Sequence, residues 1–312
     1  MLSEAELIVD RRRMRRRLGF WRALAVALAL LAVGALAWRG GAFTRYESHI
    51  ARLTISGLIT GDQPTLDLVE KIRTSDAAKA VILRIDSPGG TTAGSEALYE
   101  SLRKLAKDKP VVAVMDTVAA SGGYITAIAA DHIVARGNTI TGSIGVIFSF
   151  PEISKLLETI GVKMEEIKSG ELKAEPSPYK PVSDKVRAVA NEMVQDSFAW
   201  FTGLVAERRG IALDQVKVLA DGRVYTGRQA VANKLIDELG GEAEAVTWLE
   251  GKKDIAKDLP VSDWKLATNV DPTGLGFSIA SGLMRAFGLS GFDQKAAAAQ
   301  LDGLLVLWHP QL

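Results

Sequence analysis

The chain has 312 residues, which is enough for one large domain or two small ones. Its formal net charge at pH 7 is +1, so the composition gives no electrostatic reason to expect a nucleic-acid partner. Cysteine is absent, which excludes disulfide bonds, thiolate nucleophiles and thiolate metal sites. A catalytic triad or an imidazole metal site would have to draw on three histidines, His49, His132 and His309.

The N-terminal region combines a basic cluster with a long apolar run. The segment from Phe20 to Trp38 is apolar apart from Arg22, and it comes close to the roughly 20 residues that a bilayer-spanning helix needs. Trp21 and Trp38 stand at its two ends, where interfacial aromatic residues are favoured. The basic cluster precedes the run, which predicts a cytoplasmic N-terminus. Its members are Arg11, Arg12, Arg13, Arg15, Arg16 and Arg17.

This pattern divides the beginning of the chain into a basic cytoplasmic segment (1–19), a transmembrane anchor (20–38) and a linker (39–49). The alternative is a cleaved signal peptide, because Ala35-Leu36-Ala37 resembles a small-x-small cleavage site. The run is longer than a usual signal-peptide core, which favours the uncleaved anchor. Both hypotheses export the rest of the chain. We expect a single-pass protein of the inner (cytoplasmic) membrane with its main domain on the periplasmic side.

Residues 50–260 show short apolar runs that alternate with helical patterns, which is typical of an α/β domain with right-handed crossovers. Strands are expected at 51–59, 80–85, 111–115 and 132–135. Helices are expected at 65–74, 93–107, 121–130, 184–209 and 228–233. Residues 261–312 are expected to form a C-terminal extension that binds a partner or is partly disordered, with a helix at 294–307.

Two glycine-rich turns carry the chemical signal. The first, Asp86-Ser87-Pro88-Gly89-Gly90, follows an apolar strand, and its backbone N–H groups could approach a ligand closely. Such donors stabilise an oxyanion when they point at one place. The alternative is an ordinary tight turn before a helix. A parallel sheet brings the carboxyl ends of neighbouring strands to one edge, where ligands bind. Two such turns on neighbouring strands therefore indicate a site more strongly than either turn alone.

The second turn, within 118–124, places Ser121 between a strand and a helix N-terminus, where the backbone turns sharply and the helix dipole favours negative charge. This arrangement has the logic of a nucleophile elbow with a different sequence. The alternative is that Ser121 only caps the helix.

A serine nucleophile needs a base. His132 begins the next predicted strand, at the opposite edge of the sheet, while His49 and His309 lie in the linker and the tail. A lysine remains, and it acts as a base only when its pKa is lowered so that it is neutral near pH 7. Composition alone does not select which lysine.

Five ordered sequence blocks resemble the signal peptide peptidase A family, over about residues 50–241. They are DSPGG at 86–90, AASGGY at 119–124, TGSIGV at 141–146, SGELKAEPSP at 169–178 and DGRVYTGRQA at 221–230. The resemblance implies a Clp-protease-like, crotonase-type α/β fold with an N-terminal transmembrane helix, and a protease domain over 50–260. It also implies the short, single-domain form of the family.

Carried over motif by motif, the resemblance implies a Ser–Lys dyad. Ser121 would be the nucleophile and Lys173 the base, with the backbone N–H groups of Gly90 and Gly122 forming the oxyanion hole and Ser143 orienting the lysine. The family often has an aromatic residue before the lysine, where this chain has Leu172. Lys168 and Lys180 are therefore the alternatives for the base.

The resemblance further implies a serine endopeptidase that degrades cleaved signal peptides or other hydrophobic peptides at the membrane. A ring-like homo-oligomer is expected, an octamer by resemblance. The resemblance implies that the catalytic serine and lysine lie in one copy of the fold, although assembled neighbours can complete the site. No metal or other cofactor and no nucleic acid is expected. The rival hypotheses are a related protease that cuts intact membrane proteins, a crotonase-like enzyme acting on acyl thioesters, and an inactive scaffold.

Overall fold

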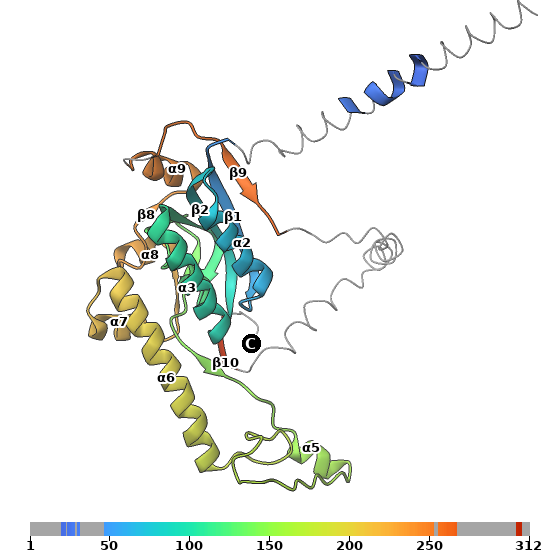
Figure 1. Ribbon diagram of the computed structural model, residues 1–312. Helices are drawn as coiled ribbons and strands as arrows, with labels where there is room; N and C mark the ends of the chain where they lie inside the picture. The colour runs from blue at the N-terminus through green and yellow to red at the C-terminus, as the bar shows by residue number, and fades with distance from the viewer. Residues whose placement is uncertain are drawn as a thin grey trace, which may run out of the picture.

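The computed structural model describes residues 20–22, 24–28, 30–31, 47–252, 255–266 and 304–307 (Figure 1). The described residues between 20 and 31 are helical. Residues 23, 29 and 32–38 of the predicted anchor (20–38) lie outside the described residues, and none of the described helices is long and apolar enough to cross a bilayer.

One mixed sheet forms the centre of the molecule. Its described strands run in the order β6-β10-β2-β3-β4-β8, with β1 and then β9 beside β2, and with β5 and then β7 beside β3. The strands are β1 (His49–Ile59), β2 (Ala78–Thr91), β3 (Val111–Ala120), β4 (His132–Ala135), β5 (Ile140–Gly142), β6 (Ile147–Phe148), β7 (Val224–Thr226), β8 (Glu238–Leu239), β9 (Val261–Trp264) and β10 (Leu304–Leu307). The pairs around β1 to β4 are parallel, whereas β10 is antiparallel to both of its neighbours.

Helices cover both faces of this sheet (Figure 1). They are α2 (Gln63–Thr74), α3 (Thr92–Asp108), α4 (Gly122–Ala127), α5 (Ser154–Thr159), α6 (Asp184–Arg209), α7 (Leu213–Leu219), α8 (Gly227–Ala232) and α9 (Glu242–Glu250). The hydrophobic core is accordingly divided in two. Val81 and Leu83 face the cluster completed by α2, α3 and α6, while Ala80 and Ile82 face the cluster completed by α9. Strands buried on both faces read as continuous apolar runs, as β2 does in the sequence.

The predicted strands and helices are largely confirmed, with three differences. β2 does not turn at Ser87 but continues to Thr91, because Ser87 Oγ donates to the carbonyl oxygen of Gly57 at 2.6 Å and the strand stays paired with β1. β1 begins at His49, inside the predicted linker. Residues 304–307 form a strand rather than the predicted helix.

Two of the sheet strands come from the predicted C-terminal extension (261–312). β9 pairs with β1, and β10 pairs with β2 and β6. His49 ties β9 to the start of β1, because its Nε2 accepts a hydrogen bond from Trp264 Nε1 at 3.0 Å while its Nδ1 lies 2.7 Å from the carbonyl oxygen of Glu47. The extension therefore completes the sheet on two sides.

Residues 149–183, which we call the arm, leave the sheet after β6 and return at the start of α6. The arm contains α5 and projects beyond the sheet, at the N-terminal end of the long helix α6 (Figure 1). Several apolar side chains in it are exposed to solvent: Leu156, Ile160, Met164, Ile167 and Leu172.

The contact of β2 with β1 requires glycine at position 90. A Cβ on Gly90 would lie 1.8 Å from the carbonyl oxygen of Ile59, which is backbone and cannot move away cheaply. We predict that Gly90→Ala lowers the free energy of unfolding by about 3 kcal/mol or more, the upper range for overpacking. Chemical denaturation measures this change.

The matched control is Gly203→Ala in α6, where an added Cβ meets nothing within 4 Å. Alanine is favoured over glycine in a helix by about 1 kcal/mol, so this variant should unfold at higher denaturant concentration than the wild type. Equal effects of the two substitutions would contradict the assigned role of Gly90.

Candidate active site

Ser121 lies at the junction of β3 and α4 with a strained backbone, at φ 55° and ψ −115°. A positive φ is uncommon outside glycine, and such strain gathers at functional sites. The conformation is held from both sides. The Ser121 N–H donates to the Gly142 carbonyl at 2.8 Å, and the Ser121 carbonyl accepts from the Ile125 N–H at 3.0 Å.

The hydroxyl of Ser121 is buried, and no hydrogen bond within the described part of the chain satisfies it. The residue is 1% exposed, and among the described residues its Oγ has no hydrogen-bond partner. It also makes no capping bond to α4, so the hypothesis that this hydroxyl serves only as a helix cap is wrong. Buried hydroxyls normally find partners, and one that does not is a candidate for a chemical role.

The two glycine-rich motifs meet at one edge of the sheet, as predicted. Ser87 pairs with Ala119 across β2 and β3, and the start of α4 packs against β2 so closely that a Cβ on Gly123 would lie 2.6 Å from the Ser87 carbonyl. Gly122 is the first residue of α4, where a backbone N–H has no acceptor within the helix. Gly90 lies on the adjoining end of β2.

The third motif, TGSIGV, forms the other side of this edge. β5 runs beside the end of β3, and Ser143 follows the Gly142 carbonyl that holds Ser121. Ser143 is 8% exposed and also has a positive φ, 49°, while its N–H donates to the Arg223 carbonyl at 2.8 Å. Ser143 is thus close in the chain to the contact that fixes Ser121.

Lys173 lies elsewhere, on the arm. Its side chain is exposed, and its backbone N–H closes a turn onto the Gly170 carbonyl at 3.1 Å. Since Ser121 Oγ has no partner among the described residues, Lys173 does not hydrogen-bond to it, and no described bond joins Lys173 to Ser143. A single chain brings Ser121, Gly90, Gly122 and Ser143 to one edge of the sheet but leaves Lys173 on the projecting arm.

The two alternative lysines are engaged in ion pairs on the arm. Lys168 Nζ lies 2.8 Å from Glu166 and 2.9 Å from Glu175, and these carboxylates raise the pKa of Lys168. Lys180 Nζ lies 2.5 Å from Glu175, whose pKa is lowered to about 2, first by Lys180 and then by Lys168. A lysine held protonated by carboxylates cannot accept a proton from serine, so the geometry disfavours Lys168 as the base.

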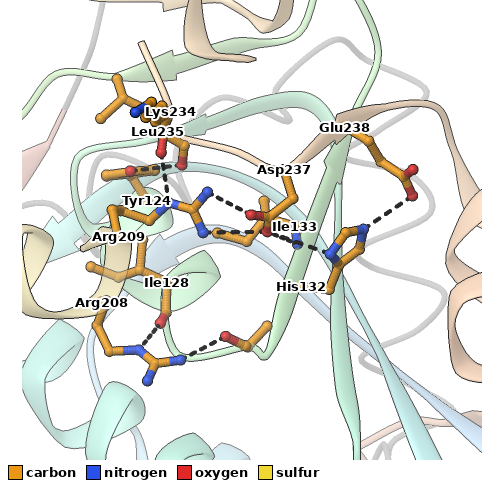
Figure 2. A network of polar contacts seen from close by, with 11 residues as sticks. Tyr124, Ile128, His132, Ile133, Arg208, Arg209, Lys234, Leu235, Asp237 and Glu238 are labelled. Carbon is orange, nitrogen blue, oxygen red and sulfur yellow. Dashed lines mark hydrogen bonds and ion pairs between the residues drawn. The ribbon is translucent and has the colours of Figure 1, made fainter. Parts of the chain in front are cut away.

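Neither of the two described histidines forms a hydrogen bond with the Ser121 hydroxyl. His132 pairs with Val112 at the start of β3, at the opposite edge of the sheet, as predicted. Figure 2 shows its ring directed at Asp237 and Glu238, with Nε2 3.1 Å from a Glu238 oxygen. His49 is buried and its ring stacks against Trp264 of β9, and His309 lies outside the described residues. Within the described part of the chain there is also no cluster of three His, Asp or Glu side chains that could hold a metal ion.

One feature of this edge has no signal in the sequence. β10 runs antiparallel to the end of β2, with Leu305 opposite Thr91 and Leu307 opposite Gly89, and its other side pairs with β6. One side of β2 pairs with β1 as far as Gly90. The other side pairs with β3 as far as Ser87, and beyond Ser87 it pairs with β10. An extended backbone, that of β10, therefore lies between β2 and β6. It is close to the end of β3, which Ser121 follows.

These features define a site built around a buried serine at one edge of a mixed α/β sheet. Residues 103–256 match the model of peptidase family S49. A Synechocystis sp. protein named as a protease is 34% identical over 254 residues, which cover 76% of this chain and 91% of the relative. An Enterococcus faecium protein named as signal peptide peptidase SppA is 36% identical over 233 residues, 70% of this chain and 67% of the relative.

A third relative, the chloroplastic serine protease SPPA of Arabidopsis thaliana, is 36% identical over 220 residues, which are 69% of this chain and 32% of that longer protein. The chain belongs to peptidase family S49, the signal peptide peptidase A family. It is a serine-type peptidase.

The strand β10 occupies the side of β2 at which a peptide would pair, so its removal should open the site. We predict that deleting residues 304–312 raises kcat/KM for an unstructured peptide several-fold, because the substrate no longer competes with this strand for the backbone of β2. Steady-state hydrolysis measures the change. A deletion variant that folds but shows unchanged kcat/KM and unchanged labelling of Ser121 by a fluorophosphonate would contradict the prediction.

Proposed function

We propose that this protein is a membrane-anchored serine endopeptidase that uses a Ser121–Lys173 dyad to degrade cleaved signal peptides. The observation that carries the proposal is the Ser121 hydroxyl, which is buried, without a partner among the described residues, and set on a strained turn at the carboxyl edge of the sheet. Membership of family S49 supports the same nucleophile. We also infer that the α/β fold is of the Clp-protease, crotonase-like type.

The proposed chemistry is acyl transfer. Neutral Lys173 takes the proton of Ser121 as Oγ attacks the peptide carbonyl carbon, and the backbone N–H groups of Gly90 and Gly122 bind the oxyanion that forms. One such donor is typically worth about 3–4 kcal/mol in the transition state. The lysinium then protonates the leaving amine, and a water molecule, deprotonated by the same lysine, hydrolyses the acyl-enzyme. Ser143 orients the lysine by a hydrogen bond.

We propose that the lysine reaches the serine from a neighbouring copy in a homo-oligomer. Lys173 is exposed on the arm, and apolar side chains around it face solvent, as a surface that packs against another copy would. A lysine enclosed between two copies would lose hydration, which lowers its pKa and favours the neutral base. The octameric count rests on the family resemblance alone.

The pairing of β10 with β2 supports a class of substrate. A strand of this chain pairs with β2 beside the proposed oxyanion donors, which supports peptides bound in extended form. Hydrophobic, unstructured signal-peptide remnants suit such a site, and one relative carries the name signal peptide peptidase. A protease of intact membrane proteins is the alternative. An acyl-thioester enzyme is less well supported, because the three relatives reported above are named as proteases or peptidases.

We further propose that residues 20–38 anchor the protein in the inner membrane, with the N-terminus in the cytoplasm and the protease domain on the periplasmic side. The apolar run and the preceding arginines support this orientation. The expected outcome is that the protein isolated from membranes keeps residues 1–38 and stays in the membrane fraction after alkaline washing. A mature N-terminus near Trp38, found by N-terminal sequencing, would mean a cleaved signal peptide instead.

The dyad and its sharing between copies are tested together. We predict that Ser121→Ala and Lys173→Ala each lower kcat on a signal peptide by at least about 10³-fold, as loss of a nucleophile or its base does. Mixing equal amounts of the two inactive variants and reassembling them should restore about a quarter of the wild-type activity. A site then needs an intact Ser121 from one copy and an intact Lys173 from its neighbour, and each of these residues is intact in half of the copies.

The matched control is Lys180→Ala, which removes a lysine from the same arm that pairs with Glu175. It should keep kcat within about threefold, since it removes no reacting group. Full activity of Lys173→Ala would refute the assigned base, and an inactive mixture would place both members of the dyad in one chain. Hydrolysis of acyl-CoA but not of peptides would favour the thioester alternative.

A further inference from the structure

The C-terminal end of α4 is held by arginines from two other helices. Three consecutive carbonyl oxygens follow the helix, and each accepts a guanidinium hydrogen bond. Arg208 of α6 donates from Nε to Ile128 at 2.8 Å and from Nη2 to Ala130 at 2.9 Å. Arg103 of α3 donates from Nη1 to the carbonyl between them, that of Ala129, at 2.7 Å. Figure 2 shows Arg208 reaching across to Ile128.

These contacts matter because the end of α4 is out of reach of water. All residues from Ser121 to Ala130 are buried, so the terminal carbonyls, which lack partners within the helix, must find them in the protein. A cation is also the charge that a helix C-terminus attracts. Burial lowers the pKa of Arg208, with further repulsion from Arg103, yet a guanidinium remains charged in proteins. The protein thus keeps a partly desolvated charge at this place.

Arg208 and Arg103 together hold the C-terminal end of α4, a helix that also packs against β2, β3 and α3. α4 has six residues, begins directly after Ser121, and carries one large polar side chain, Tyr124, whose hydroxyl donates to the Leu235 carbonyl at 2.8 Å. Arg208 makes two of the bonds at the far end of α4. A shift of the helix along its axis would move the Ser121 hydroxyl and the Gly122 N–H together, because both belong to its first turn.

We propose that Arg208 is a positioning residue for the nucleophile. By binding the Ile128 and Ala130 carbonyls it sets the axial position of α4, and thereby places Ser121 Oγ and the Gly122 N–H against the same substrate carbonyl. The proposal rests on the proposed function, in which Ser121 is the nucleophile. Misplacement of reacting groups by about 1 Å can cost about 10²-fold in rate, so small movements of α4 are sufficient.

The neighbouring residue provides the matched control. Arg209 also leaves the end of α6, but it donates to the Lys234 carbonyl at 2.9 Å and to Asp237 at 2.7 Å, and it does not bind the carbonyls of α4 (Figure 2). Replacing either arginine by glutamine removes one partly buried guanidinium from the same helix end. Of the two replacements, only that of Arg208 removes hydrogen bonds to the carbonyls at the end of α4.

The experiment measures kcat and KM of the full chain on one signal-peptide substrate. We expect Arg208→Gln to lower kcat by about 10²-fold with KM within about twofold, because substrate binding is kept while the reacting groups are misplaced. Arg209→Gln should unfold at a similarly lowered temperature but keep kcat within about threefold. In Arg208→Ala, millimolar guanidinium should restore part of kcat, and the same concentration of sodium chloride should not.

Each outcome decides the proposal. Wild-type kcat in Arg208→Gln, or an equal loss of kcat in Arg209→Gln, would overturn it, since the effect would then be absent or merely structural. If Arg208→Gln does not fold, Arg208→Lys replaces it, and wild-type kcat in that variant, which lacks the two-pronged contact, overturns the proposal. An active Ser121→Ala would instead refute the proposed function. Inactive Ser121→Ala together with fully active Arg208→Gln refutes this inference alone.

Discussion

The parallel pairing of β2 with β3 is the interaction on which the other parts of the structure depend. Successive residues of β2 face opposite cores, as Val81 and Ile82 do, so a slip of one residue would exchange the two faces. The register holds as far as Ile85 opposite Met115, and an irregularity between Ile85 and Ser87 then brings Ser87 opposite Ala119. The ends of both strands reach the same edge of the sheet, where their glycine-rich segments meet.

The elements around that edge hold the backbone of Ser121 in an energetically unfavourable conformation. A strained non-glycine backbone costs about 1–3 kcal/mol and persists only where the surroundings enforce it. At Ser121 the enforcement comes from β5 through the Gly142 carbonyl, and from α4, which packs on β2 without space for a Cβ at Gly123. The far end of α4 is held by Arg103 and Arg208. Ser121 and the helix that follows it are thus supported by β2, β5, α3 and α6.

Sequence patterns predicted those parts of the structure that depend on local information. The apolar runs at 80–85 and 111–115 identify buried strands because a strand covered on both faces has no polar side. Ser121 could be recognised because a serine between such a strand and a small-residue helix has a definite place in an α/β sheet. The separation of His132 from Ser121 followed from the direction of the strands and is confirmed.

The parts that sequence patterns missed depend on partners far along the chain. β2 continues past Ser87 because of a bond to the Gly57 carbonyl, which belongs to another strand. Arg208 contacts a carbonyl 80 residues away, and a backbone acceptor leaves no mark in the sequence. The position of Lys173 has no local signal either, because an exposed lysine on an arm looks like any surface charge until the surface it meets is known.

The C-terminal strand β10 has a consequence for how the enzyme would respond to its surroundings. Because it belongs to the same chain, its local concentration at β2 does not change when the protein is diluted. A peptide from solution must therefore displace a tethered competitor, and the outcome depends on the concentration of the peptide and not on that of the enzyme. Folded proteins nearby, which expose few free strands, would be poor competitors, whereas a local excess of loose hydrophobic peptide would gain access. The strand would raise the concentration of unfolded peptide at which the site is half occupied.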